Sequence, residues 1–112
     1  MITAVFYKKG REFSGFRVSG HAGYDEYGLD IACASVSSAV ELSANLITEI
    51  FHISADVKVS EDADNAVTLK IAETCEEDQK QNASKVIEGL KLHLELLSEE
   101  FEKTIKTEIS EV

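Results

Sequence analysis

The feature that most constrains the fold is a repeated switch between two-residue and helical periodicity. Residues 1–7 and 13–19 are rich in β-branched and aromatic types, and the short turn "KKGRE" separates them. This pattern predicts an antiparallel hairpin. Residues 55–59 and 66–72 alternate apolar and polar side chains around a second turn. They predict a second hairpin, so each hairpin precedes a stretch with helical spacing.

The two stretches that follow the hairpins predict helices. In the first, apolar residues recur at helical spacing from Ile31 to about Phe51, and Asp30 is the expected N-cap. The second begins at about residue 76, with Thr74 as the expected N-cap, and its apolar residues follow in steps of three and four to Phe101. Residues 104–112 alternate again and predict either a short final strand or a loose tail.

The element order is therefore β-β-α-β-β-α with a possible C-terminal strand. Hairpins with two amphipathic helices predict an α+β fold, a two-layer sandwich of a mainly antiparallel sheet and two helices. The chain has 112 residues and shows no linker, internal repeat or low-complexity segment. We expect a single domain over residues 1–112.

Charge and composition narrow the class of partner. The net charge is −10, with 21 acidic and 11 basic residues. Nucleic-acid binders usually show a basic face, so direct nucleic-acid binding is not expected, whereas cationic partners should be attracted. Nothing approaches eighteen consecutive apolar residues, so no membrane span is expected. The N-terminal residues lack the pattern of a signal peptide, and we expect a cytoplasmic protein.

One histidine and one cysteine flank a glycine-containing loop and point to thiol chemistry. His21 follows the second strand, and Cys33 falls three residues after the expected N-cap, in the first turn of the helix. A helix start lowers the pKa of a thiol there and favours the nucleophilic thiolate. His21 could act as its base and later as an acid, and the free N–H groups near Cys33 could form an oxyanion hole. Asp30 either caps the helix or orients His21.

Residues 20–29 are expected to form a loop that could order over a substrate, and the resemblance given below places its flexible part at Ala22 to Leu29. Gly20, Gly23 and Gly28 make it permissive, and Tyr24 and Tyr27 could form aromatic walls.

The same residues also have simpler interpretations. A cysteine on a helix is often a small buried hydrophobe, and a histidine after a strand is often structural. Cys75 precedes three acidic residues and is expected at the core or its boundary. No two Cys or His residues show metal-ligand spacing, and no phosphate-binding glycine motif is present, so neither a metal nor a cofactor is expected. A redox role is the weakest hypothesis because no resolving cysteine is near.

The segment "GHAGYDEYGLDIACASVS" resembles the signature of the Prp family of ribosomal-processing cysteine proteases. The pattern is G-H-A, a loop ending in G-x-D-I, and then C-A-x-x-S after one small residue. The chain departs from it at Ala32, where valine is common. The matching residues are Gly20, His21, Ala22, Gly28, Asp30, Ile31, Cys33, Ala34 and Ser37.

The resemblance implies a specific activity. Family members remove the N-terminal extension of large-subunit ribosomal protein twenty-seven, cutting after an aromatic pair. By this resemblance Cys33 and His21 form the catalytic dyad, and Asp30 and Ser37 support it. The resemblance also implies a homodimer and a flexible loop over the site. The alternative is a non-enzymatic, acidic, ribosome-associated binding module.

Overall fold

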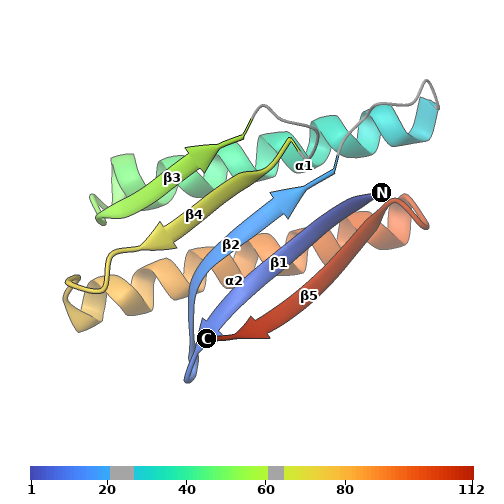
Figure 1. Ribbon diagram of the computed structural model, residues 1–112. Coiled ribbons are helices and arrows are strands. Elements are labelled where there is room, and N and C mark those ends of the chain that lie inside the picture. The colour runs from blue at the N-terminus through green and yellow to red at the C-terminus, as the bar shows by residue number, and fades with distance from the viewer. Residues whose placement is uncertain (21–26, 61–64) are drawn as a thin grey trace.

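The computed structural model describes residues 1–20, 27–60 and 65–112, and Figure 1 shows the arrangement of its elements. In chain order they are β1 (Ile2–Lys9), β2 (Glu12–Ser19), α1 (Tyr27–Asn45), the π-helical turn η1 (Leu46–Ile50), β3 (Ala55–Val59), β4 (Val67–Ile71), α2 (Glu77–Glu100) and β5 (Ile105–Glu111). The predicted element order is confirmed, and residues 104–112 contain the final strand.

The strands form one sheet in the order β3-β4-β2-β1-β5. Both predicted hairpins are present, and β2 also pairs antiparallel with β4. β5 pairs parallel to β1, with Ile2 opposite Ile105. Both helices lie on the same side of the sheet, with α1 toward β3 and β4 and α2 behind β2 and β1 (Figure 1). The expected α+β fold with a mainly antiparallel sheet is confirmed.

The core fills the space between the sheet and the helices. Phe6, Phe16 and Leu69 from the sheet are fully buried, together with side chains from both helical segments. Complete burial of one such side chain contributes about 1.5–3 kcal/mol. The N–H of Phe13 also donates a hydrogen bond to Ser84 Oγ at 2.9 Å, which ties β2 to α2.

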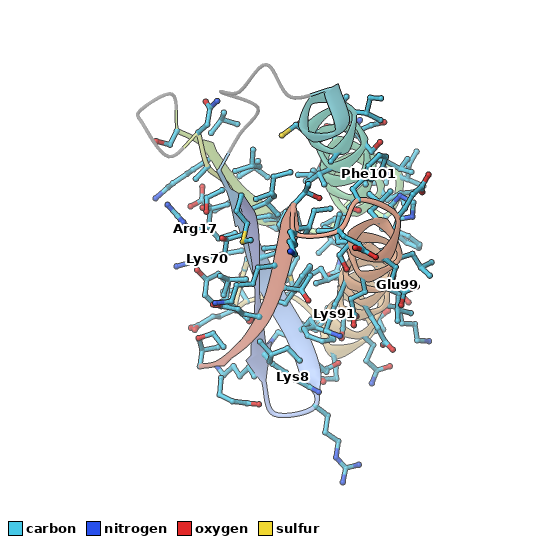
Figure 2. All side chains as sticks on the ribbon, turned by 90° about the vertical axis from the view of Figure 1, so that its right-hand side faces the viewer. Lys8, Arg17, Lys70, Lys91, Glu99 and Phe101 are labelled. Atoms are coloured by element: carbon cyan, nitrogen blue, oxygen red, sulfur yellow. The ribbon has the colours of Figure 1, made fainter. Side chains whose placement is uncertain are left out.

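The opposite face of the sheet is polar. Figure 2 shows Arg17 and Lys70 on the side of the sheet away from the helices. The Nζ atom of Lys70 lies 5.9 Å from the centroid of the Tyr7 ring, a cation–π contact. The fold therefore buries one face of the sheet and leaves the other to solvent.

The start of α1 and the N-cap residue of α2 differ from the prediction. α1 begins at Tyr27, so Asp30 lies inside the helix and is not its N-cap. Residues 27–29 contain no proline, and one glycine costs only about 1 kcal/mol in a helix, so the local signals did not fix the boundary. The N-cap of α2 is Glu76 rather than Thr74. Its N–H donates to Gln79 Oε1 at 3.1 Å, as in a capping box, so the helix starts two residues later than a Thr74 cap would place it.

The helical segment Ile31–Ile50 is long and apolar enough to cross a membrane by length and composition alone, with a mean hydropathy of 1.3. Its side chains Val36, Val40 and Ile47 join the core cluster, and core helices of soluble proteins often pass the same test. The prediction of no membrane span was based on the lack of a long uninterrupted apolar run in the sequence, which the mean hydropathy of this helix does not reveal.

Gly20 directly follows β2, at a point where its backbone lies close to the backbone of Met1 and Ile2. Its φ of +89° is in the region that favours glycine. A Cβ atom built on Gly20 would lie 2.2 Å from the backbone oxygen of Met1. No flexible side chain could move to relieve this contact, so the position requires glycine.

We predict that Gly20→Ala lowers the melting temperature much more than Gly10→Ala does. Gly10 also has a positive φ, +67°, but nothing lies within 4 Å of a Cβ added there. The matched pair separates backbone strain, present in both, from the clash, present only at Gly20. Thermal unfolding followed by circular dichroism measures both changes, and equal losses would contradict the clash.

Glu12, the first residue of β2, has a carboxyl group whose pKa is raised in the folded chain. Burial raises the pKa of Glu12 above 4.5, and the hydrogen bond and negative charge of Glu77 raise it further, while Lys80 lowers it. Within the described residues, Glu12 Oε2 is buried without a hydrogen-bond partner. Because the pKa of Glu12 is higher in the folded chain, its contribution to stability is complete below the unfolded pKa and is lost as pH rises through the folded value.

We therefore predict that Glu12→Gln raises the melting temperature at neutral pH. The gain over wild type should shrink as the pH falls and disappear below 4.5, because wild-type Glu12 is protonated in both the folded and the unfolded state only below its unfolded pKa. Glu111→Gln removes the same charge from an exposed position of β5 and serves as the control. A gain that is independent of pH, or equal in the control, would contradict this origin.

Candidate active site

Cys33 lies farther into α1 than the sequence predicted. Since α1 begins at Tyr27, Cys33 is its seventh residue and lies in the second turn. The prediction of a first-turn position is wrong. In the second turn the backbone N–H bonds to the carbonyl four residues earlier, so the expected oxyanion hole from free N–H groups around Cys33 is not supported.

The Cys33 side chain lies at the boundary of the core. It is half-buried, packs against the edge of the core cluster and is not part of a disulfide. The thiol is therefore neither completely buried in the apolar core nor fully exposed to solvent. It can therefore meet a ligand that enters from the surface.

An open cleft of about 540 Å³ lies between α1 and the inner face of the sheet, and Cys33 is part of its lining. The helix contributes residues spaced three and four apart, which share one side of α1. They are Cys33, Val36, Ser37, Val40, Glu41 and Ala44.

The sheet wall of the cleft is mostly apolar. This wall includes Val57 and Val59 of β3 and Val67 of β4. The side chains of Val57 and Val59 are 41% and 67% exposed. The other strands supply Ile2, Val18 and Gly20 at the end of the wall formed by β1 and β2. A cleft lined by valines with few polar groups is typical of a site for apolar ligand groups.

The residue before the predicted catalytic histidine, His21, lies at this cleft. Gly20 lines the same cleft as Cys33, and His21 is the next residue in sequence. His21, Ala22, Gly23 and Tyr24 themselves lie outside the described residues. Tyr27 and Gly28, predicted in the loop, are instead in the backbone of α1.

The two predicted supporting residues lie on the same helix as Cys33. Ser37 is exposed, follows Cys33 by one turn and lines the cleft. Asp30 precedes Cys33 by three residues within α1. Positions 30, 33 and 37 therefore have the spacing of one helix face.

Sequence reasoning missed the sheet wall and Glu41. The alternation in "ADVKV" predicts a strand with one apolar face, but it does not tell whether that face is buried or lines a cleft. The edge position of β3 is known only from the strand order in the structure, whereas the sequence already shows Glu41 as a charged residue next to Val40 on the helix.

Cys75 lies apart from this cleft. Its Sγ atom donates a hydrogen bond to the carbonyl oxygen of Ser54 at 3.4 Å, and its side chain packs against the core cluster. The prediction of a boundary position is confirmed. Among the residues that the structure describes, no group of three His, Cys, Asp or Glu side chains is arranged to hold a metal ion.

Comparison with known proteins gives consistent matches. Residues 1–106 match the family described as Cysteine protease Prp. The ribosomal processing cysteine protease Prp of Bacillus subtilis (strain 168) is 24% identical over 91 residues, which are 81% of this chain and 80% of that protein.

Solved structures share the fold. The crystal structure of SMU.848 from Streptococcus mutans aligns with a TM-score of 0.83 at 21% identity, over 100% of this chain and 96% of that one. An essential ribosomal processing protease Prp from S. aureus, in complex with a substrate peptide, aligns with a TM-score of 0.82 at 22% identity, over 98% and 100% of the two chains. Since the family match covers nearly the whole chain, the chain belongs to the Cysteine protease Prp family and is a cysteine protease.

Proposed function

We propose that this chain is an endopeptidase that removes the N-terminal extension of large-subunit ribosomal protein twenty-seven, cutting after an aromatic pair, during ribosome maturation in the cytoplasm. The single domain of residues 1–112 carries the activity. The observation that supports this most is the apolar cleft whose lining includes the Cys33 thiol. Valine walls suit aromatic side chains next to the bond that is cut.

In the proposed mechanism Cys33 is the nucleophile and His21 is the acid and base. His21 takes the thiol proton while Sγ attacks the substrate carbonyl carbon, and a tetrahedral intermediate forms. His21 then gives this proton to the leaving amine as the C–N bond breaks, which leaves a thioester on Cys33. Water, deprotonated by His21, attacks the thioester, and the Cys33 thiol is restored when the proton returns.

Asp30 and Ser37 act as supports in this proposal. Ser37 is exposed at the cleft one helical turn from Cys33, where a hydroxyl can bind substrate backbone. In this proposal the segment between β2 and α1, which contains Tyr24, orders over the bound peptide, and Tyr27 begins α1 directly after it. No metal or cofactor takes part in this chemistry.

Electrostatics favours the proposed substrate. The chain carries a net charge of −10, and a ribosomal protein is typically basic, so encounter is accelerated at low salt. The same charge opposes direct contact with nucleic acid, so the proposed partner is the protein extension rather than ribosomal RNA.

We also propose a homodimer that forms through the helical layer. A shallow groove of about 790 Å³ between α1 and α2 is lined by Leu42, Leu46, Leu90 and Leu97. Leu42 is 61% exposed there. Apolar surface of this kind is typical of an interface between copies of a chain.

Leu42→Glu is predicted to shift the chain from dimer to monomer, because it places a charge in the apolar groove. The oligomeric state is measured by sedimentation velocity at several concentrations. Leu92→Glu is the matched control, since Leu92 is 55% exposed on α2 and does not line the groove. A dimer that survives Leu42→Glu would contradict this location.

Cys33→Ala is predicted to abolish cleavage of a peptide that carries the ribosomal extension, with a loss of at least about a thousandfold in kcat/KM. The reason is that no other described side chain supplies a thiol at the cleft. Cys75→Ala removes the other thiol and should leave kcat/KM within about twofold. Cleavage is followed by mass spectrometry of the products.

Normal turnover by Cys33→Ala would contradict the proposed nucleophile. If neither the wild type nor the variant cleaves the peptide, but both bind it in a salt-sensitive manner, the non-enzymatic binding module is supported instead.

A further inference from the structure

We propose that the free edge of β3 binds the substrate peptide as an additional β-strand, alongside the cleft that contains Cys33. This proposal rests on the proposed protease function and concerns how the peptide is held. β3 is an edge strand, because the sheet order begins with it and β4 is its neighbour on the other side. An extended peptide can therefore add to the sheet at this edge.

The hydrogen bonds of the β3–β4 hairpin show which backbone groups point outward. The N–H of Ser60 donates to the carbonyl of Ala66 at 2.7 Å, and the N–H of Ala72 donates to the carbonyl of Ser54 at 3.0 Å. Hydrogen-bonded pairs alternate along antiparallel strands, so even-numbered residues of β3 bond to β4. The N–H and C=O groups of Ala55, Val57 and Val59 thus face the open edge.

The same residues turn their side chains toward the cleft. Val57 and Val59 pair with Leu69 and Val67 of β4, whose side chains share the inner face of the sheet. Apolar side chains that are 41% and 67% exposed on an edge strand are a liability unless something covers them. A peptide strand at this edge would satisfy the backbone groups and bring its own apolar side chains next to these valines.

The charged side chains of β3 lie on the other face and leave the edge open. Asp56 and Lys58 alternate with the valines and form an exposed ion pair at 3.6 Å. Inward-pointing charged residues are one way in which proteins protect an edge strand from further pairing. Here the pair leaves the inner face to the valines.

The length of the cleft fits a short extended segment. Cys33 and Ala44 mark the two ends of the helix wall, eleven residues apart, which corresponds to about 16 Å along α1. An extended peptide advances about 3.3 Å per residue, so about five residues span this wall. A strand at β3 can thus lie along the cleft and present its scissile bond at the Cys33 end.

Charge complementarity favours a basic peptide as the occupant. Glu41 is the charged residue in the described lining of the cleft, and it lies two turns beyond Cys33 on α1. It is exposed, and no ion pair or hydrogen bond of its side chain is found among the described residues. A lysine or arginine of the peptide, about four residues from the scissile bond, would reach it.

The decisive test is an N-methyl scan of the peptide. The probe is the N-terminal extension of ribosomal protein twenty-seven from the same organism, methylated at one backbone nitrogen at a time, and its affinity for the Cys33→Ala chain is measured by fluorescence anisotropy. Strand addition directs every second peptide N–H to β3. We expect losses of about five- to tenfold at alternate positions and little change at those between them.

A variant of the protein tests the proposed hydrogen bonds between β3 and the peptide by removing a donor from β3. Val57→Pro removes the outward N–H of Val57 without removing a bond to β4, which an edge strand tolerates. Val57→Ala is the matched control, because it shortens the side chain and keeps the N–H. We expect Val57→Pro to bind the peptide about tenfold more weakly than Val57→Ala at a similar melting temperature.

The outcomes separate this proposal from the protease function. Cleavage by the wild type with no alternation in the scan would overturn strand addition and leave the protease function in place. An alternating pattern without cleavage would overturn the function and leave strand addition in place. If the peptide does not bind to the Cys33→Ala chain and is not cleaved by the wild type, both are wrong.

Discussion

The site depends on how little of the sheet α1 covers. α2 packs against β2 and β5, and the two helices contact each other, so the middle of the sheet is sealed. The core-facing side of α1 joins this cluster through Val36 and Val40, but Val57 and Val59 across from it stay exposed. The layers therefore enclose an apolar gap at one margin of the fold, and Cys33 borders it. Exposed apolar area of this kind promotes aggregation unless a ligand or partner covers it.

Two contacts fix the position of β2, whose residue Val18 lines this gap. At the Cys33 end, Gly20 brings β2 against the first residues of the chain, where a side chain would clash with backbone. The hydrogen bond between Phe13 and Ser84 anchors the opposite part of β2 to α2. His21, which we propose as the acid and base, follows Gly20 directly in the sequence, so β2 sets where the segment that carries it begins.

The sequence predicted the elements well because two-residue and helical periodicity are local signals. It failed at the start of α1: Asp30 is a favourable residue both at an N-cap and within a first turn, so it could not fix the boundary of this helix. The parallel pairing of β5 with β1 depends on contacts distant in sequence and was not predicted. Cys33 was identified from its motif, whereas the valine wall was missed, since alternation in β3 looks the same whether the apolar face is buried or open.

In our proposal the substrate peptide binds in the gap between α1 and the β3–β4 hairpin. The most direct measurement is methyl NMR of the Cys33→Ala chain, titrated with the unmodified extension peptide. We expect the methyl signals of Val40, Val57, Val59 and Val67 to shift together, while those of Leu42 and Leu46 in the groove between the helices do not. Shifts confined to the leucines of that groove, with the valines unchanged, would contradict it.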